Sequence, residues 1–250
     1  MTDGILYITY GSKYVQAAIR SARTARKHSP GILIHMFVDQ KCYEEFGLAE
    51  DPSPFSSVGV IENPHRRSKV DYISRTPFDR TLYLDSDTSI AQDISGVFDV
   101  LGRFDLAATN AQRRNGSRAN EFWTKPIPSA YPHFNGGVIL YRNSPKVLDL
   151  LRQWSVAFEE SGSEHDQATL RELIWDSNLR IATLPPEYNV RYLKYKFLWS
   201  KSEAVPMIYH LKIYHRSVNR SIFIQIFNVL MKPFNLHWAT FARKFGLPKK

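Results

Sequence analysis

The sequence predicts an α/β protein in which helices cover a mostly parallel sheet. Short apolar segments of strand length alternate with segments of helical periodicity, and two carboxylates directly follow one of the apolar strands. The connections between the early strands are about a dozen residues or longer, which parallel strands require and antiparallel strands do not. A chain of 250 residues with 43% hydrophobic residues suits one large domain, or one domain with an appendage.

The first half of the chain carries the regular alternation of strands and helices. The expected strands are residues 5–10, 32–38, 58–61 and 82–84. Between the first two, Val15, Ile19 and Ala22 recur at helical spacing and form one apolar face, so a helix is expected there. Residues 44–57 are rich in Pro, Ser and acidic residues and are expected to form a loop, and residues 68–75 a short helix.

Two carboxylates with one residue between them follow the strand that ends at Leu84. If the extended backbone continues past Leu84, Asp85 and Asp87 share one face and project from the carboxyl edge of the sheet toward one cation. An Asp-x-Asp pair also occurs in turns and at helix starts without any ligand. Its position directly after a buried strand, where open α/β sheets bind their ligands, favours a binding role.

The second half of the chain is less regular. The expected strands are residues 106–109, 138–141, 181–184 and 207–210, and the expected helices are residues 146–160 and a helix that starts at 165–167. Gly136 and Gly137 precede one strand, where glycines let the backbone approach a ligand closely, although a tight turn is an equal alternative. The polar, Arg-rich segment 110–125 is expected to form an active-site flap or an insertion. His210 ends its strand, as Asp85 ends its own.

The basic charge of the chain is concentrated at its carboxyl end. The net charge is +9, and residues 216–250 contain seven basic residues and no acidic one. Two segments of this tail, before and after Pro233, have apolar faces at helical spacing. We therefore expect a domain over residues 1–215, followed by basic amphipathic helices that dock on an anionic membrane surface. Packing of these helices on the domain, or in a homodimer, is the alternative.

The composition argues against several protein classes. A single cysteine, Cys42, excludes an intramolecular disulfide, and the first residues lead into a strand without the pattern of a signal peptide. No apolar run reaches the roughly 18 residues that span a bilayer. We therefore expect a cytoplasmic protein that is peripheral on the inner face of the cell membrane, with no nucleic-acid partner.

Five short motifs follow one another along the chain. They are Tyr83-Leu84-Asp85-Ser86-Asp87-Thr88, Phe134-Asn135-Gly136-Gly137-Val138, Asp166-Gln167, Leu184-Pro185-Pro186-Glu187-Tyr188-Asn189 and Ile208-Tyr209-His210. Their order and spacing resemble those of GT-A fold glycosyltransferases, and among these the glycogenin-like family 8 enzymes. The resemblance covers about residues 4–216. It implies transfer of a sugar from a nucleotide-diphosphate donor, with a UDP-sugar favoured, to a glycan or lipid-linked acceptor, with retention of the anomeric configuration.

The resemblance also implies a metal site. In those enzymes the Asp-x-Asp pair and a histidine on a late strand hold Mn²⁺ on the donor diphosphate, which here implies Asp85, Asp87 and His210. Two carboxylates and one imidazole suit Mn²⁺ better than Mg²⁺, which prefers an all-oxygen shell and remains the alternative. The metal would act as a Lewis acid on the charge that develops on the departing diphosphate. Where those enzymes carry a Lys-Pro-Trp segment after the histidine, the cations of this chain are Lys212, His215 and Arg216.

The same resemblance assigns the remaining site residues. The residues implied to contact the nucleotide and diphosphate of the donor are Tyr7, Thr9, Tyr14, Arg66, Lys69, Asp85, Ser86, Gly136, Gly137 and Lys212. Asn135, Asp166 and Gln167 are implied to face the donor sugar and the acceptor, and they are the candidate catalytic residues. Asp166 equally suits the start of a helix, where a carboxylate offsets the helix dipole. No enzyme nucleophile is assigned.

Two other function classes fit parts of the sequence. An apolar strand followed by Asp-x-Asp-x-Thr is also typical of haloacid-dehalogenase-like phosphatases, in which Asp85 would be the phosphorylated nucleophile and Asp87 the general acid. That motif normally closes the first strand of its domain, whereas several expected strands precede it here. The other alternative is a non-catalytic sugar- or membrane-binding module. Mn²⁺-dependent hydrolysis of a UDP-sugar separates the three classes.

Overall fold

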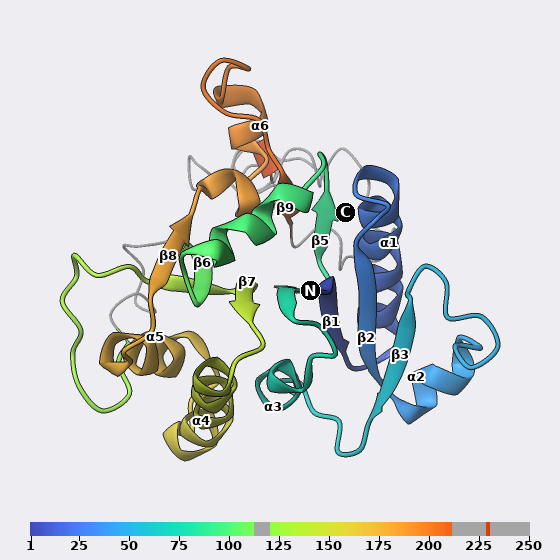
Figure 1. Ribbon diagram of the computed structural model, residues 1–250, viewed down its shortest axis with the longest axis horizontal. Coiled ribbons are helices and arrows are strands. Elements are labelled where there is room, and N and C mark those ends of the chain that lie inside the picture. Colours follow the sequence, from blue (N-terminus) through green and yellow to red (C-terminus); the bar gives the residue numbers. More distant parts are fainter. Residues whose placement is uncertain (113–120, 212–228, 231–250) are drawn as a thin grey trace, which may run out of the picture.

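A seven-stranded sheet forms the centre of the protein (Figure 1). The computed structural model describes residues 1–112, 121–211 and 229–230. In spatial order, the strands of the sheet are β3 (Ser57–Ile61), β2 (Leu33–Asp39), β1 (Asp3–Thr9), β4 (Arg80–Leu84), β7 (Phe134–Arg142), β6 (Leu106–Asn110) and β8 (Ile181–Leu184). The first four are parallel, β8 is parallel to β6, and β7 runs antiparallel to both of its neighbours. The predicted mostly parallel sheet is confirmed.

Each face of the sheet carries its own apolar core. On β1, Ile5 and Tyr7 belong to one cluster of buried side chains, whereas Leu6 and Ile8 belong to the other. Successive side chains of a strand point to opposite faces, so a strand that is apolar throughout must be covered on both sides. The run of apolar residues in β1 thus requires a layer of helices on each face.

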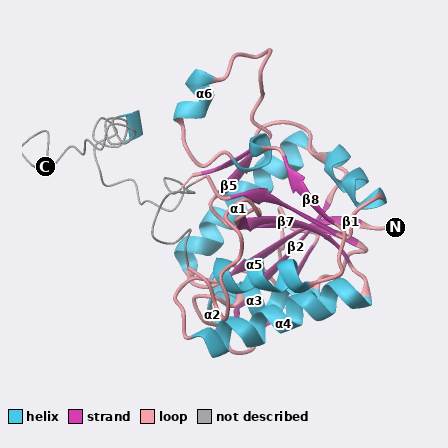
Figure 2. Cartoon of the chain, turned by 90° about the vertical axis from the view of Figure 1, so that its left-hand side faces the viewer, coloured by secondary structure: helices cyan, strands magenta, loops and turns pink. Residues whose placement is uncertain are grey.

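Helices on each face of the sheet form these two layers. The helices of the described residues are α1 (Ser12–His28), α2 (Gln40–Glu45), α3 (Lys69–Tyr72), α4 (Pro145–Ser161), α5 (Gln167–Asp176) and α6 (Lys194–Leu198), with the 3₁₀ helices η1 (Ile73–Arg75), η2 (Ser95–Gly102) and η4 (Pro186–Asn189). Buried residues of α1 and η2 pack on one face of the sheet, and those of α3, α4 and α5 pack on the other, where Figure 2 shows them together. The expected helix over residues 68–75 is the short α3 continued by η1. Helix α2 was not expected; Asp39 caps it by accepting a hydrogen bond from the Cys42 N–H at 3.0 Å.

A smaller sheet of two strands positions residues at the edge of the main one. Strand β5 (Thr88–Ile90) pairs in antiparallel register with β9 (Ile208–His210), and Thr88 lies opposite His210. Because β5 follows β4 after a short turn, this pairing brings the end of β9 to the carboxyl end of β4 (Figure 1). Two segments far apart in the sequence therefore meet where α/β sheets bind ligands.

Some predicted features lie outside the described residues. They are residues 113–120 of the expected flap, residues 216–228 and 231–250 of the expected tail, and the cations Lys212, His215 and Arg216. Within the described part of the chain, no helix combines the length and the apolar composition that crossing a bilayer requires.

Candidate active site

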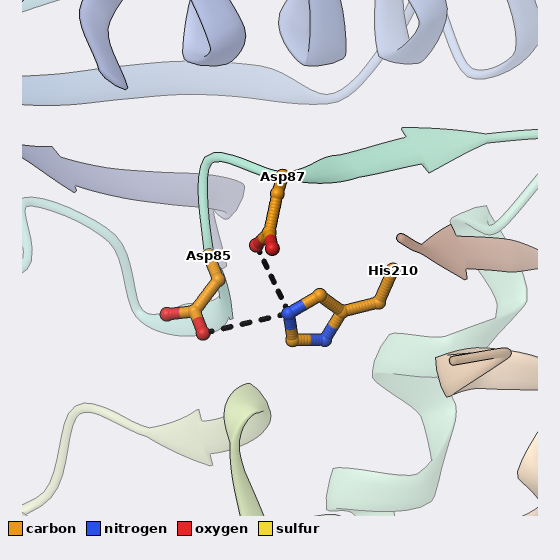
Figure 3. Close-up of side chains that lie close together, drawn as sticks. All are labelled: Asp85, Asp87 and His210. Atoms are coloured by element: carbon orange, nitrogen blue, oxygen red, sulfur yellow. Dashed lines mark ion pairs between the residues drawn. The ribbon is translucent and has the colours of Figure 1, made fainter. Parts of the chain in front are cut away.

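Two carboxylates and one imidazole converge at the carboxyl edge of the main sheet (Figure 3). Asp85 follows β4, Asp87 precedes β5 and His210 ends β9. His210 Nε2 lies 3.0 Å from Asp87 Oδ1 and 3.6 Å from Asp85 Oδ2. One ligand atom from each residue lies within 4.8 Å of the other two, so a single cation could contact all three. The structure thus brings together the residues predicted to hold a metal.

A turn, and not continued strand geometry, aligns the two carboxylates. The extended backbone ends before Asp85, and residues 86 and 87 form a turn that leads into β5. The Asp85 N–H donates to the Gly137 carbonyl at 2.9 Å, and the Leu211 N–H donates to the Asp87 carbonyl at 3.0 Å. These two hydrogen bonds hold the turn in place, one from β7 and the other from the residue that follows β9. The strand therefore does not continue past Leu84, contrary to what the sequence interpretation had assumed. The two carboxylates nevertheless converge as predicted.

A chain of buried hydroxyl groups supports this turn from the core. The Thr88 hydroxyl donates to the Asp85 carbonyl at 2.9 Å and shares a hydrogen bond with Ser21 Oγ at 2.7 Å. Ser21 Oγ in turn lies 2.8 Å from the hydroxyl of Tyr7, which is fully buried. Burial also raises the pKa of Tyr7, so its hydroxyl stays protonated. The structure places Tyr7 in the core behind the turn, and not on an open nucleotide pocket as the resemblance implied.

Gly137 lies directly behind the three converging side chains. A Cβ atom at this position would lie 2.4 Å from His210 Cε1 and 2.5 Å from Asp85 Oδ2, closer than any side chain tolerates. The glycine was predicted to let the backbone approach a ligand. In the structure it makes room for the protein's own imidazole and carboxylate. Gly136 is less crowded, with the Lys69 ammonium 3.3 Å from the position of a Cβ. Both glycines lie inside β7, which corrects the expectation that they precede the strand.

Hydrogen bonds to Asn189 determine the tautomer of His210. Asn189 Nδ2 donates to Thr109 Oγ1 at 2.7 Å and to Asn135 Oδ1 at 3.0 Å, so its Oδ1 is the acceptor that faces His210 Nδ1 at 2.8 Å. His210 Nδ1 therefore carries a proton, and Nε2 points at the two carboxylates. A lone pair on Nε2 would repel a carboxylate oxygen only 3.0 Å away unless a cation or a proton lies between them. This donor set fits a divalent metal.

A polar pocket of about 180 Å³ adjoins the three converging side chains. Its lining residues are Arg67, Lys69, Asp85, Glu121, Asn135, His165, Asp166, Gln167, Ala168 and Arg191. Five of them, namely Lys69, Asp85, Asn135, Asp166 and Gln167, were predicted to be site residues. Because Asp85 belongs to both the pocket and the converging group, a molecule in the pocket could contact a metal bound there.

Lys69 and Asp166 form a buried ion pair on the wall of this pocket. Lys69 Nζ lies 2.8 Å from Asp166 Oδ2, 3.7 Å from Asp85 Oδ1, and donates to the Gly136 carbonyl at 3.1 Å. Burial alone would raise the pKa of Asp166, but the charges of Lys69 and Arg67 outweigh it and hold the pKa below its ordinary value. Burial disfavours the charged form of Lys69, yet the two carboxylates raise its pKa. Both groups are therefore charged near neutral pH. Asp166 precedes α5, but its carboxylate forms no capping hydrogen bond with this helix.

Several residues implied to contact the nucleotide and diphosphate do not line the pocket. Within the described residues they are Tyr7, Thr9, Tyr14, Arg66, Ser86, Gly136 and Gly137. Thr9 is buried and donates to the Phe37 carbonyl at 3.4 Å, whereas Tyr14 is 40% exposed on α1. Arg66 is exposed, and the adjacent Arg67 contacts Asp166 instead.

Sequence reasoning missed other residues of the site. Those that line the pocket are Arg67, Glu121, His165, Ala168 and Arg191. Tyr83 orients Asp85 by donating to its Oδ1 at 2.8 Å. Tyr83 and Asn189 both belong to motifs that the sequence analysis had singled out. For Arg191 the available signal was its position two residues after Asn189. No pattern in the sequence distinguishes Arg67 from Arg66.

Comparison with known proteins decides the family. Residues 80–217, more than half of the chain, match the nucleotide-diphospho-sugar transferase family. The chain belongs to this family. It is therefore a glycosyltransferase that takes its sugar from a nucleotide-diphospho-sugar, and the predicted resemblance to GT-A glycosyltransferases is confirmed. No curated protein matches the transferase by sequence.

Solved structures of glycosyltransferases share the fold of this transferase. Galactosyltransferase LgtC, in complex with donor and acceptor sugar analogs, has a TM-score of 0.60 at 15% identity, over 84% of this chain and 87% of LgtC. GlyE of Streptococcus pneumoniae TIGR4 has a TM-score of 0.57 at 18% identity, over 88% of this chain and 56% of GlyE. Mouse xyloside xylosyltransferase 1 has a TM-score of 0.57 at 13% identity, over 87% of this chain and 100% of that chain. The likeness extends over most of the transferase and concerns its fold.

Proposed function

We propose that the transferase moves a sugar from a UDP-sugar to a glycan or lipid-linked acceptor, with Mn²⁺ held by Asp85, Asp87 and His210. The observation that carries this proposal is the convergence of two carboxylates and an imidazole nitrogen beside a polar pocket. Two oxygen ligands and one nitrogen ligand favour Mn²⁺ over Mg²⁺. The choice of UDP, and retention of the anomeric configuration as in family 8 enzymes, are supported by the order of the five motifs.

Some residues of the site would stabilise charge on the donor diphosphate, and others would orient the donor sugar. A bound metal would supply Lewis-acid stabilisation of the departing diphosphate. Lys69, charged and 3.7 Å from Asp85, adds positive charge next to the metal ligands. Asn135 and Gln167 offer amide donors and acceptors to sugar hydroxyls in the pocket, and the Asp166 carboxylate offers an acceptor. Binding the donor sugar in this manner would hold its anomeric carbon in one orientation toward the acceptor.

The test is metal binding and UDP-sugar hydrolysis by the wild type, Asp85→Asn and Asp87→Asn, with Asp149→Asn as control. Asp149 is an exposed carboxylate on α4 that accepts a hydrogen bond from Gln153. We expect the two site variants to lose Mn²⁺ binding in electron paramagnetic resonance titrations and to lose activity by about 10²-fold or more. The control should retain both properties. Near-native hydrolysis by both site variants with Mn²⁺ would refute the metal site.

The same assay separates the function classes and the nucleotides. UDP-, GDP- and dTDP-sugars are compared with a phosphomonoester. Family membership decides against the phosphatase, because the Asp-x-Asp pair here follows the fourth strand of a nucleotide-diphospho-sugar transferase. Slow hydrolysis of one nucleotide-sugar identifies the donor, and hydrolysis of a GDP- or dTDP-sugar but not of a UDP-sugar would refute the choice of UDP.

We further propose that the basic tail over residues 216–250 docks the enzyme on an anionic membrane surface, on the cytoplasmic side, near a lipid-linked acceptor. The support is its seven basic residues without an acidic one and its apolar faces at helical spacing. Flotation of the full chain on anionic vesicles at low salt tests this, and loss of flotation at high salt is expected because the attraction is electrostatic. A full chain that fails to float at low salt would contradict the proposal and favour packing of the tail on the domain or in a homodimer.

A further inference from the structure

Arg191 is a pocket cation whose charge is not offset. Among the residues that the structure describes, its guanidinium has no ion-pair, hydrogen-bond or aromatic partner. The other lysine and arginine of the pocket do have partners. Lys69 and Arg67 both contact Asp166, at 2.8 and 3.6 Å, and the His165 side chain lies 3.6 Å from Glu121 Oε2.

The backbone that carries Arg191 is held beside the candidate metal site. The Val190 N–H donates to the Ile208 carbonyl, and the His210 N–H donates to the Val190 carbonyl, both at 2.9 Å. Arg191 therefore follows a residue that is paired with the strand ending in His210. The side chain of Gln112 fixes the same segment, because its Oε1 accepts from the Arg191 N–H at 3.1 Å. A cation on a backbone held in this way is placed before any ligand arrives.

We propose that Arg191 binds the diphosphate of the donor and stabilises the departing nucleoside diphosphate, an inference that rests on the proposed function. The two charges of a bound divalent metal would be offset by the carboxylates of Asp85 and Asp87. Lys69 and Arg67 share the charge of Asp166. A diphosphate bound at the metal, at the edge of this pocket, therefore needs a further cation. A guanidinium presents paired N–H donors that match phosphate oxygens.

The transfer step explains why such a cation would act on the rate. The bond between the anomeric carbon and the phosphate oxygen breaks with both electrons on that oxygen. The acceptor oxygen bonds to the anomeric carbon, and its proton passes to the departing phosphate. Negative charge builds up on the phosphate oxygens as the bond breaks, so it is larger in the transition state than in the bound donor. Hydrogen bonds from Arg191 to these oxygens strengthen at that point, so they lower the barrier more than they tighten donor binding.

The experiment compares Arg191→Gln and Arg191→Lys with Arg23→Gln, a control at an exposed arginine on α1. Calorimetry measures the binding of UDP and of uridine in the presence of Mn²⁺. Paramagnetic resonance measures the binding of Mn²⁺ alone, and steady-state assays measure UDP-sugar turnover. We expect Arg191→Gln to bind UDP about tenfold more weakly and to lose about 10²-fold in kcat. Binding of uridine and of Mn²⁺ alone should not change. Arg191→Lys should recover part of both losses, because it keeps the charge without the paired donors.

The outcomes separate this inference from the proposed function. If the wild type binds UDP with Mn²⁺ and Arg191→Gln matches it in UDP affinity and kcat, the role of Arg191 is refuted and the proposed function stands. A rise in the KM of the acceptor alone, with unchanged UDP affinity, also refutes it, since Arg191 would then contact the acceptor. A wild type that neither binds UDP with Mn²⁺ nor turns over a UDP-sugar contradicts the proposed function, and this inference with it.

Discussion

Replacing Gly137 by alanine tests whether the three converging side chains depend on the absence of a side chain behind them. The added Cβ would lie 2.4 Å from His210 Cε1, 2.5 Å from Asp85 Oδ2 and 3.0 Å from Asp85 Cγ. His210 is 2% exposed and bonded to Asn189, so its ring has little freedom to move. The side chain of Asp85 is 29% exposed. We therefore expect the carboxylate of Asp85 to be displaced, away from the position in which it faces His210 Nε2.

The expected magnitude combines two opposing terms. Overpacking a filled site typically costs about 1–3 kcal/mol, whereas exchanging glycine for alanine in a strand recovers about 0.5–1 kcal/mol of conformational entropy. We expect a net loss of roughly 0.5–2 kcal/mol in the free energy of unfolding. Displacement of one of three ligands should weaken Mn²⁺ binding by about tenfold or more. Urea unfolding without metal and a Mn²⁺ titration by paramagnetic resonance measure the two effects.

Two other glycines provide matched controls. At Gly136 the added Cβ would lie 3.3 Å from Lys69 Nζ, the end of a flexible side chain, so Gly136→Ala should have the smaller effect. At Gly31 nothing lies within 4 Å of an added Cβ, so Gly31→Ala should retain the Mn²⁺ affinity of the wild type. If Gly137→Ala binds Mn²⁺ as tightly as Gly31→Ala, the argument that this glycine makes room for a metal site is refuted.

Two further predictions concern a hydrogen-bond acceptor and a buried histidine. Asn189→Ala removes the acceptor that orients His210, and we expect Mn²⁺ binding to weaken by about 10- to 100-fold. Asn189→Asp keeps an acceptor oxygen and should recover part of this affinity. Unchanged Mn²⁺ affinity in both variants would contradict the orienting role of Asn189. Burial lowers the pKa of His35 from 6.5 to about 4, so the unfolded state takes up a proton first as the pH falls. This contribution to stability is fully present above pH 6.5 and is lost toward pH 4. Urea unfolding should show a smaller decrease over this range in His35→Gln, and an equal decrease would refute the assignment.

The central parallel strands could be predicted from the sequence, because their apolar pattern and their place inside the sheet lead to the same assignment. The apolar runs of β1 and β2 identified these strands to within one or two residues, because a parallel strand covered on both faces has no polar side. The direction of β7 was not predictable. A run such as Val138 to Tyr141 is apolar in either direction, and which neighbours it pairs with depends on the connections before and after it.

The two carboxylates of the candidate site could be predicted from the sequence. The residues that surround and position them were harder to predict. Asp85 and Asp87 could be found because their position after a strand has a physical meaning at the carboxyl edge of a sheet. Gly137 could be noted, but its reason for being glycine is the position of His210, which only the pairing of β5 with β9 determines. The choice of Arg67 over Arg66 depends on side-chain direction in a turn, for which the sequence has no periodicity to follow.

The hydrogen bonds of Asn189 join the candidate metal site and the pocket into one unit. Its side chain accepts from His210 Nδ1 and donates to Asn135 Oδ1, which also accepts from the Gly137 N–H at 3.2 Å. Asn135 lines the pocket and His210 belongs to the candidate metal site, so neither can turn without breaking a buried hydrogen bond. A donor held by its diphosphate at the metal and by its sugar in the pocket would therefore contact two sites with a fixed separation. Because that separation is fixed before binding, the binding energy of the sugar can be used to hold the anomeric carbon in place, which is what an enzyme that transfers a sugar requires.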